Sequence, residues 1–347
     1  MNTTKRDSNI ELLRIICMIM VLAIHVNYFS TGALTNIEAK EFPIQSILRS
    51  FSHALCVGAV NTFVMISGYF GINYKTKGLI SLLYQCLFFC FGIYVILLLL
   101  NLTEISKISV ASSFLLFKQA DNYWFVWSYI ILYILSPVLN HFTKNSAKAE
   151  FRKVLILFFI FQFIIDSTPG NNFYRLGFSP LSFIGLYLLV QYYKRFNVAF
   201  SKTASLSIFI GFVLLNTFAE YSIKLFNINN GIINSIVSGY TSPITIVQSL
   251  ALLIYFTHIK IQNKFINWVA ASCFAVYLFH MHFCIVDYYT QSANRIFNEY
   301  HGIKYILIIS VQIFIFFTVP IIIDKIRIYS FGKLWNILEE RCPRLTN

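Results

Sequence analysis

The sequence has few charged residues. Only 12% of its 347 residues are Asp, Glu, Lys or Arg, whereas 57% are hydrophobic. A soluble globular domain carries roughly one quarter charged residues, because these cover the surface that faces water. No polar domain interrupts the apolar segments between residues 10 and 323. This composition excludes an ordinary soluble protein and indicates a single membrane domain over residues 1–347.

The sequence also lacks the motifs of several enzyme classes. It contains no Walker loop, no Gly-x-Gly-x-x-Gly, no Gly-x-Ser-x-Gly elbow and no metal-ligand spacing. Internal repeats of the kind found in many transporters are not evident. These absences argue against nucleotide hydrolysis, serine-hydrolase chemistry and a metal site. The seven cysteines have no regular spacing and lie mostly in apolar segments, so we expect them to be packing residues.

What the sequence does contain is a series of apolar segments. Because about 20 mostly apolar residues cross a bilayer core, these segments predict an all-α integral membrane protein, a bundle of about ten transmembrane helices. The first segment is longer than the apolar region of a signal peptide and lacks a cleavage site, so we expect it to be retained. The fifth is short and the sixth contains Pro180, so one or both could be re-entrant or broken. The predicted spans are 10–29, 53–72, 79–100, 123–140, 152–166, 177–193, 203–222, 240–259, 265–286 and 303–323, followed by a short tail, 326–347.

The distribution of positive charge predicts the orientation. Cytoplasmic loops are enriched in Lys and Arg. With ten spans, both termini and the even-numbered loops share one side, and that side holds most of the 27 lysines and arginines, from Lys5 and Arg6 to Arg344. Both termini are therefore predicted to be cytoplasmic. The basic rim suits anionic lipid or an anionic cofactor, and since topology explains the charge, nucleic-acid binding is not implied.

The first predicted helix carries an arginine and a histidine. Ionisable groups within membrane spans are costly and usually face the protein interior or a water-filled path. Arg14 and His25 are eleven residues apart, which places them on one face of a helix about 16 Å apart. Arg14 could bind a phosphate at the inner rim, and His25 could take a proton from a hydroxyl deeper in the membrane. Alternatively, Arg14 could reach lipid headgroups and His25 could bond to a neighbouring helix.

The segment from Asn9 to His25 resembles the opening helix of membrane acyltransferase family three, whose members O-acetylate polysaccharides and other surface glycans. The family pattern is a basic residue, ten others and a histidine, and Arg14 and His25 fit it. The resemblance extends from residue 9 to about 325. Three further segments agree with the family in order: Phe63-Val-Met-Ile-Ser-Gly-Tyr-Phe70, the stretch from Trp124 to Ser136-Pro137, and Val276-Tyr-Leu-Phe-His280.

The resemblance implies an O-acyltransferase of the cell (inner or plasma) membrane. Acetyl-CoA or a related acyl-CoA would be the donor, a co-substrate rather than a permanently bound cofactor, and a surface polysaccharide or lipid-linked sugar would be the acceptor. It implies that His25 acts as general base, or as a transient acyl carrier, and that Arg14 holds the donor's phosphates. Many members have an arginine motif in the loop after span two. Here Lys75 and Lys77 stand in that loop, which leaves their part in donor binding open.

Four other residues are candidates for substrate binding. His280 is predicted in the outer half of span nine, as His25 is in span one, so it could lie near the acceptor or bond between helices. Ser67 and Tyr69 lie along span two, where polar residues often serve helix contact, and Gly68 between them would permit close approach. Trp124 begins span four at the interface, where it could anchor the helix or stack on a sugar.

Further histidines have weaker interpretations. His53 falls at the outer boundary of span two, where an interfacial histidine costs little. His282 and Asp287 are five residues apart and would point away from each other on a continuous helix, which argues against a shared site. The competing function is a transporter or flippase for lipid-linked sugar, which would also use buried polar groups. No Asp or Glu stands clearly in the middle of a predicted span, which argues against an ion-coupled carrier.

Overall fold

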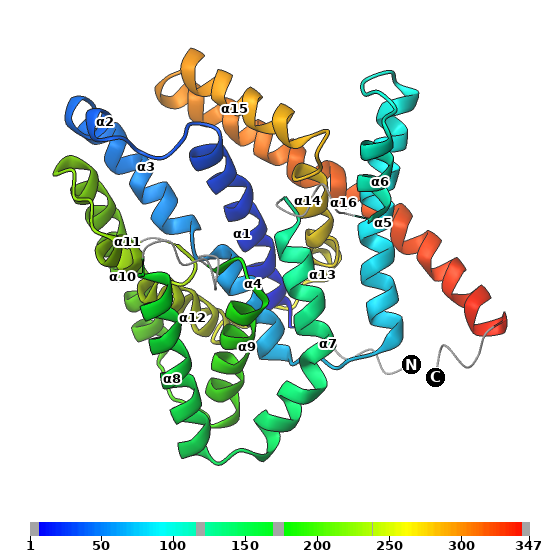
Figure 1. The fold of residues 1–347 in the computed structure, drawn as a ribbon, viewed down its shortest axis with the longest axis horizontal. Coiled ribbons are helices and arrows are strands. Elements are labelled where there is room, and N and C mark those ends of the chain that lie inside the picture. Colours follow the sequence, from blue (N-terminus) through cyan, green and yellow to red (C-terminus); the bar gives the residue numbers. More distant parts are fainter. Residues whose placement is uncertain (1–6, 116–121, 169–176, 238, 342–347) are drawn as a thin grey trace. The chain divides into compact units, whose positions relative to one another are not determined.

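The computed structural model describes residues 7–115, 122–168, 177–237 and 239–341. Across these ranges all regular secondary structure is helical, which confirms the all-α prediction (Figure 1). Lys5, Arg6, Cys342 and Arg344 lie outside the described residues. The chain forms two compact units. The first comprises Met1–Ile72 and Leu135–Asn267, and the second comprises Asn73–Ile134 and Trp268–Asn347.

Six helical segments in the described part of the chain are long and apolar enough to cross a membrane. Their exposed leucine, isoleucine and phenylalanine side chains suit lipid rather than water. The chain is thus a multi-pass membrane protein. The six segments are Ser8–Phe29, Pro43–Phe70, Thr76–Leu99, Trp124–Asn145, Lys202–Leu225 and Gly302–Arg341.

The first unit contains the N-terminal helices and the middle of the chain. Helices α2 and α3 pack on each other and on α10, and α11 lies beside α10 and α12 (Figure 1). Helix α7 enters this unit with its second half. The helices are α1 (Ser8–Ile24), the π-helix η1 (His25–Phe29), α2 (Asn36–Glu41), α3 (Pro43–Cys56), α4 (Ala59–Phe70), α7 (Trp124–Asn145), α8 (Lys148–Asp166), α9 (Pro180–Arg195), α10 (Lys202–Leu225), α11 (Gly231–Val237) and α12 (Pro243–Thr257).

Helix α1 is an interior helix of the first unit. It packs against α3, α4 and α12, and just over half of its span is buried, compared with 22% of α10. Ile10, Leu13 and Cys17 follow a three- and four-residue spacing and are fully buried, as a helix inside a bundle requires. Its first turn is tied to the end of α12, because the Asn9 amide donates to the Phe256 carbonyl at 2.8 Å. Protein rather than lipid therefore surrounds much of the helix that carries Arg14 and His25.

Gly68 allows α4 and α9 to approach closely, as predicted. A Cβ atom at this position would lie 3.1 Å from the Tyr187 carbonyl oxygen and 3.3 Å from Cβ of Val190. The amide of Gln191 donates to the Gly68 carbonyl at 2.6 Å, so the two helices also share a hydrogen bond. A larger side chain at position 68 would push α9 away.

The second unit holds the remaining helices around a buried ion pair. Arg327 donates to both carboxylate oxygens of Asp324, from Nε at 2.8 Å and from Nη2 at 2.9 Å, and the Gln85 amide donates to Asp324 Oδ1 at 3.0 Å. The network joins α5 to α16. The helices are α5 (Thr76–Leu99), α6 (Lys107–Leu115), the first half of α7, α14 (Cys273–His280), α15 (Val286–Glu299) and α16 (Gly302–Arg341), while α13 (Lys264–Ala270) begins in the first unit and ends in the second.

The single helix predicted at 265–286 is wrong, because the structure has the short helices α13 and α14 there, with α15 starting at Val286. The ring of His282 lies in the turn after α14. Its Nε2 donates to the Cys90 carbonyl at 3.0 Å, and the Cys284 backbone N–H donates to its Nδ1 at 3.2 Å. A side chain that takes up a backbone N–H in this way competes with the helical hydrogen bonds, so the helix ends.

Two other predicted boundaries differ widely from the observed ones. The second span begins at Pro43 rather than residue 53, because Pro43 starts α3 and Pro is favoured in the first turn of a helix. The predicted tail, 326–347, is helical as far as Arg341, because α16 continues without interruption past residue 323. The packing role predicted for the cysteines is confirmed for the described ones: Cys17, Cys56, Cys86, Cys90 and Cys273 are buried, and Cys284 is partly buried.

Replacing Gly68 with leucine is expected to destabilise the protein by about 1–3 kcal/mol, because the new side chain overlaps the α9 backbone. Gly211→Leu is the matched control, since a Cβ at Gly211 in α10 meets no atom within 4 Å. The measurement is thermal unfolding in detergent, followed with a thiol-reactive dye that reports exposure of the buried cysteines. Equal midpoints for the two variants would contradict the packing that we describe.

Candidate functional site

Arg14 is held by a neighbouring carboxylate on α1. Its Nη1 lies 2.6 Å from Oε2 of Glu11, one turn earlier. The Glu11 side chain is 5% exposed and that of Arg14 is 25% exposed, so the pair reaches from the interior of the first unit to an accessible position. A guanidinium has five N–H donors and this contact uses one of them. Arg14 can therefore hold an anionic ligand without leaving Glu11.

His25 lies at the point where α1 changes its winding. It has helical backbone angles, φ −68° and ψ −36°, and begins the π-helix η1. The Ser30 backbone N–H donates to the His25 carbonyl at 3.2 Å, five residues back, as a π-helix requires. Its half-buried ring lies edge-on to Phe29, with centroids 4.8 Å apart. Such π-turns are rare and are found frequently at functional sites.

Arg14 and His25 share one helical face, as the sequence spacing indicates. Helix α1 is regular from Ser8 to Ile24, so the eleven-residue separation corresponds to about three turns and about 16 Å along the axis. The predicted arrangement, with Arg14 and His25 on one face, needs a regular helix between the two residues, and α1 is regular there. The roles of the two side chains stay predictions.

A second histidine contacts a carboxylate in the first unit. His53 in α3 lies with Nδ1 2.9 Å from Oε2 of Glu220 in α10. The ring of Tyr28 in η1 is stacked on the imidazole, with centroids 5.0 Å apart and an angle of 23° between the planes. The sequence analysis gave His53 little weight and missed Glu220. The signal was present, because Glu220 is the single acidic residue in the apolar segment 203–222.

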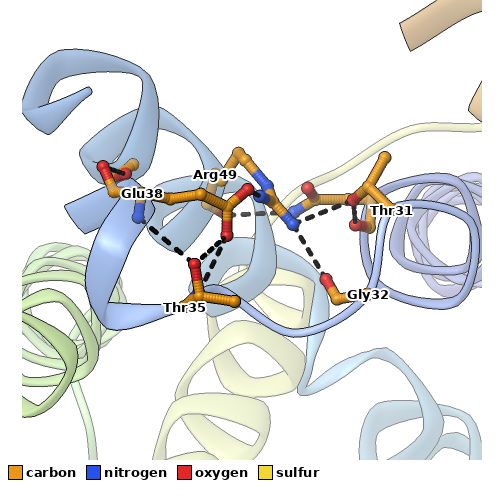
Figure 2. A network of polar contacts seen from close by, with 7 residues as sticks. Thr31, Gly32, Thr35, Glu38 and Arg49 are labelled. Atoms are coloured by element: carbon orange, nitrogen blue, oxygen red, sulfur yellow. Dashed lines mark hydrogen bonds and ion pairs between the residues drawn. The ribbon is translucent and has the colours of Figure 1, made fainter. Parts of the chain in front are cut away.

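The π-helix is fixed to α3 by a polar network around Arg49. The Asn27 amide donates to the Arg49 carbonyl at 2.9 Å. The Arg49 guanidinium donates to Glu38 at 2.6 Å, to Thr31 at 2.9 Å and to the Gly32 carbonyl at 2.8 Å (Figure 2). Figure 2 shows the guanidinium between the Glu38 carboxylate on one side and the Thr31 hydroxyl and Gly32 carbonyl on the other. The residues that follow His25 are therefore held in place.

Glu38 is a charged anchor of this network. Partial burial acts to raise the pKa of its carboxyl, but hydrogen bonds from the backbone and hydroxyl of Thr35 and the charge of Arg49 outweigh burial. The result is a pKa below the ordinary glutamate value. Thr35 and Glu38 also form a capping box at the start of α2, so the same carboxylate begins that helix.

The structure places Ser67 and Tyr69 in α4, also in the first unit. The Ser67 hydroxyl lies 3.5 Å from the Phe63 carbonyl, within its own helix. Lys194 contacts Tyr69 twice, donating to its carbonyl at 2.6 Å and lying 4.7 Å from the centre of its ring. These contacts join α4 to α9, and a substrate role for either residue stays a prediction.

The other predicted site residues lie in the second unit. Lys75 is exposed, and its backbone N–H donates to the Tyr133 hydroxyl at 3.1 Å. Lys77 lies 4.8 Å from the centre of the Trp335 ring. Trp124 begins α7 and contacts Phe125 edge-on. His280 is fully buried, and its Nδ1 donates to the Val276 carbonyl at 2.7 Å.

His282 and Asp287 do not lie on one continuous helix, so the geometry assumed for them in the sequence analysis is wrong. Both ring nitrogens of His282 are bonded, Nε2 to the Cys90 carbonyl and Nδ1 to the Cys284 N–H. This histidine has a structural role, because it has no nitrogen left for a ligand.

The sequence comparison identifies the family. The profile described as an acyltransferase domain, that of acyltransferase family three, matches residues 7–325 and so spans both compact units. The protein is a membrane acyltransferase by this match. It belongs to acyltransferase family three, the family that the sequence motifs indicate. No curated protein and no solved structure matches the chain.

The Glu38–Arg49 network is expected to lose its stabilising effect in acid. Because the folded-state pKa of Glu38 is lowered, its contribution is complete above the ordinary glutamate pKa of about 4.5 and is lost as the pH falls through the lower folded-state value. Wild type and Glu38→Gln should therefore differ in thermal midpoint at pH 7 and converge as the pH falls through the lowered folded-state pKa of Glu38. A difference that stays constant between pH 7 and pH 3 would show that the Glu38 charge has no part in it.

Proposed function

We propose that this acyltransferase moves an acetyl group from acetyl-CoA to a hydroxyl of a surface polysaccharide or lipid-linked sugar. The observation that carries the proposal is that the family match includes one interior helix bearing both a cation and an imidazole. The cation, Arg14, is one quarter exposed and the imidazole, His25, is half-buried, so neither is enclosed in an apolar core. A donor and an acceptor can meet along this face of α1.

Arg14 binds the phosphates of the donor. An arginine fork pairs with phosphate oxygens through two parallel hydrogen bonds, and four of the Arg14 N–H donors have no partner among the described residues. Glu11 holds the Arg14 side chain in place, since a buried carboxylate orients its guanidinium partner. Lys75 and Lys77 add positive charge at the start of α5, and we place them on the donor side of the reaction.

His25 acts as general base. It takes the proton of the acceptor hydroxyl as the oxygen attacks the thioester carbonyl carbon. The new C–O bond forms, the C–S bond breaks, and the departing thiolate of coenzyme A receives the proton from the imidazolium. Direct transfer of this kind needs no acyl-enzyme. We also place four further residues in contact with a substrate. In the proposed topology His280 and Trp124 fall in the outer half of their spans, whereas Ser67 and Tyr69 lie near the cytoplasmic end of α4.

The proposed topology brings the two substrates from opposite sides. With ten spans and both termini in the cytoplasm, Arg14 lies near the inner leaflet, where acetyl-CoA is available, and His25 lies past the middle of the membrane. The acceptor then approaches from the outer face of the cell membrane. The tail, 326–347, is on the cytoplasmic side in this arrangement. We also propose that the whole chain, 1–347, works as a single acyltransferase domain.

The catalytic assignment is tested with His25→Ala and Arg14→Ala in purified protein reconstituted in nanodiscs. His25→Ala should lower the rate of acetyl transfer to extracted surface glycan by about 10²–10⁴-fold, the usual contribution of a general base, without weakening acetyl-CoA binding. Arg14→Ala should weaken acetyl-CoA binding by about 10–100-fold, since a hydrogen bond to a charged group contributes roughly 1.5–3 kcal/mol.

The controls are His141→Ala and Arg152→Ala, exposed residues of the same unit. Both should behave as wild type. Full transfer activity in His25→Ala would remove the catalytic assignment. Wild-type protein that neither binds nor consumes acetyl-CoA would overturn the proposed reaction and favour transport of a lipid-linked sugar.

The topology is tested with reporter fusions. Green fluorescent protein fused after residue 347 should fluoresce and alkaline phosphatase fused there should be inactive, because the C-terminus is proposed to be cytoplasmic. Phosphatase inserted at Gly32, in the connection between η1 and α2, should be active because that connection is proposed to be external. The reverse pattern at either position would contradict the orientation.

A further inference from the structure

The contact between His53 and Glu220 is neither fully exposed nor fully buried. The two side chains are 13% and 11% exposed, and they join α3 to α10. A pair that served only to hold two helices together would work equally well fully buried. Both side chains therefore keep a small exposed surface.

The orientation of the imidazole leaves one nitrogen available. Because Nδ1 faces the Glu220 carboxylate, the neutral ring carries its proton on Nδ1, and Nε2 is a hydrogen-bond acceptor. No hydrogen bond to Nε2 exists within the part of the chain that the structure describes. A carboxylate that holds one ring nitrogen while the other faces a ligand is a common way to fix a histidine for binding.

An aromatic side chain lies on the His53 ring, and a second one is exposed next to it in the sequence. Tyr28 is stacked on the His53 ring and is itself 40% exposed, and Phe29 is 63% exposed. Small-molecule sites combine aromatic surface with a few fixed polar groups, and the apolar face of a sugar ring stacks on aromatic side chains. An exposed tyrosine ring beside a fixed hydrogen-bond acceptor provides both elements for a sugar.

The π-helix connects this cluster to the proposed base. His25 begins η1 and Tyr28 follows three residues later in the same five-residue element. The Asn27 amide and the Arg49 network hold η1 on α3, the helix that carries His53. The Tyr28–His53 stack is therefore fixed to the same element that presents His25.

The charges around the cluster favour an uncharged ligand. Arg49 lies one turn before His53 on α3, but its guanidinium is already engaged by Glu38, Thr31 and the Gly32 carbonyl. Glu220 is the charged group that contacts the imidazole, with its Oε2 2.9 Å from Nδ1. A sugar carboxylate or phosphate would be repelled, whereas a neutral hydroxyl would not.

We propose that His53, Glu220 and Tyr28 form a subsite for the acceptor, in which a neutral sugar ring lies on Tyr28 and donates a hydroxyl hydrogen bond to Nε2 of His53. This inference rests on the proposed function, because it names the part of the acceptor that is bound beside His25. Tyr28 and His53 would position the acceptor, and Glu220 would act through His53 by holding its ring.

The first test measures sugar binding without any donor. The probes are the methyl glycosides of glucose, galactose, N-acetylglucosamine and rhamnose, with methyl glucuronide as the acidic comparison. Saturation-transfer NMR on the protein in nanodiscs should detect at least one neutral glycoside and a weaker signal for the glucuronide. Tyr28→Leu and His53→Gln should each reduce the signal about fivefold or more, and His141→Gln, an exposed histidine of the same unit, should retain it.

The second test separates binding from chemistry with the best of these glycosides as acceptor. Tyr28→Leu and His53→Gln should raise its KM about 10–100-fold, the loss expected for one hydrogen bond or one stacked ring, and change kcat less than about threefold. The Kd for acetyl-CoA should stay within about twofold of wild type. Tyr28→Leu leaves the buried Glu220 paired, so it reports on the subsite even if the histidine variant does not fold.

Three results would overturn the subsite. They are no binding of any neutral glycoside by wild type, equal binding by wild type and both variants, and a stronger signal for the glucuronide. A parallel loss of acetyl-CoA affinity in Tyr28→Leu would show a general structural role instead. Sugar binding that follows the predicted pattern without any acetyl transfer would count against the proposed reaction alone and leave the subsite standing.

Discussion

The structure depends on the cost of placing charged groups inside an apolar helical protein. An isolated charge in such surroundings loses its hydration, so it needs a partner close by. Three contacts in the described part of the chain meet this need, Glu11 with Arg14, Glu220 with His53, and Asp324 with Arg327. The positions of these pairs determine which helix faces are fixed against protein and cannot turn toward lipid.

The three pairs differ in what they connect. Glu11 and Arg14 lie one turn apart on α1, and their pairing holds a cation at an accessible position without linking two helices. Asp324 and Arg327 also belong to one helix, but the Gln85 amide extends their network to α5. His53 and Glu220 lie 167 residues apart in the sequence and join α3 directly to α10. The first pair therefore suits ligand binding, the second stability, and the third both.

Two local features, one in α1 and one in α4, could be predicted from the sequence because they follow from helix geometry and residue size. The relation between Arg14 and His25 needs only 3.6 residues per turn, and the close approach at Gly68 needs only the missing Cβ. The change to a π-helix at His25 could not be predicted. It shifts hydrogen bonds from the fourth to the fifth residue, and contacts with α3 through Asn27 and Tyr28 accompany it. Glu220 was visible in its apolar segment, but its partner could be found only from the packing of α10 on α3.

The end of the helix after α14 shows a second limit of prediction from the sequence. The segment 265–286 has the composition of a membrane span, and hydropathy alone predicts one helix. The ring of His282 instead bonds to Cys90, a residue of α5, and to a backbone N–H of its own turn. Tertiary hydrogen bonding therefore decides the secondary structure here, and a long-range contact of this kind leaves no local pattern in the sequence.

The length of α16 has a consequence for the surroundings in which the second unit works. A helix from Gly302 to Arg341 measures about 60 Å if straight, whereas the hydrocarbon core of a bilayer is about 30 Å thick. Roughly half of α16 therefore lies at or beyond the headgroups. In that half, exposed apolar residues such as Ile326 and Ile337 alternate with cations such as Lys333 and Arg341. The surface charge and thickness of the host bilayer thus become part of the environment that sets the position of α16.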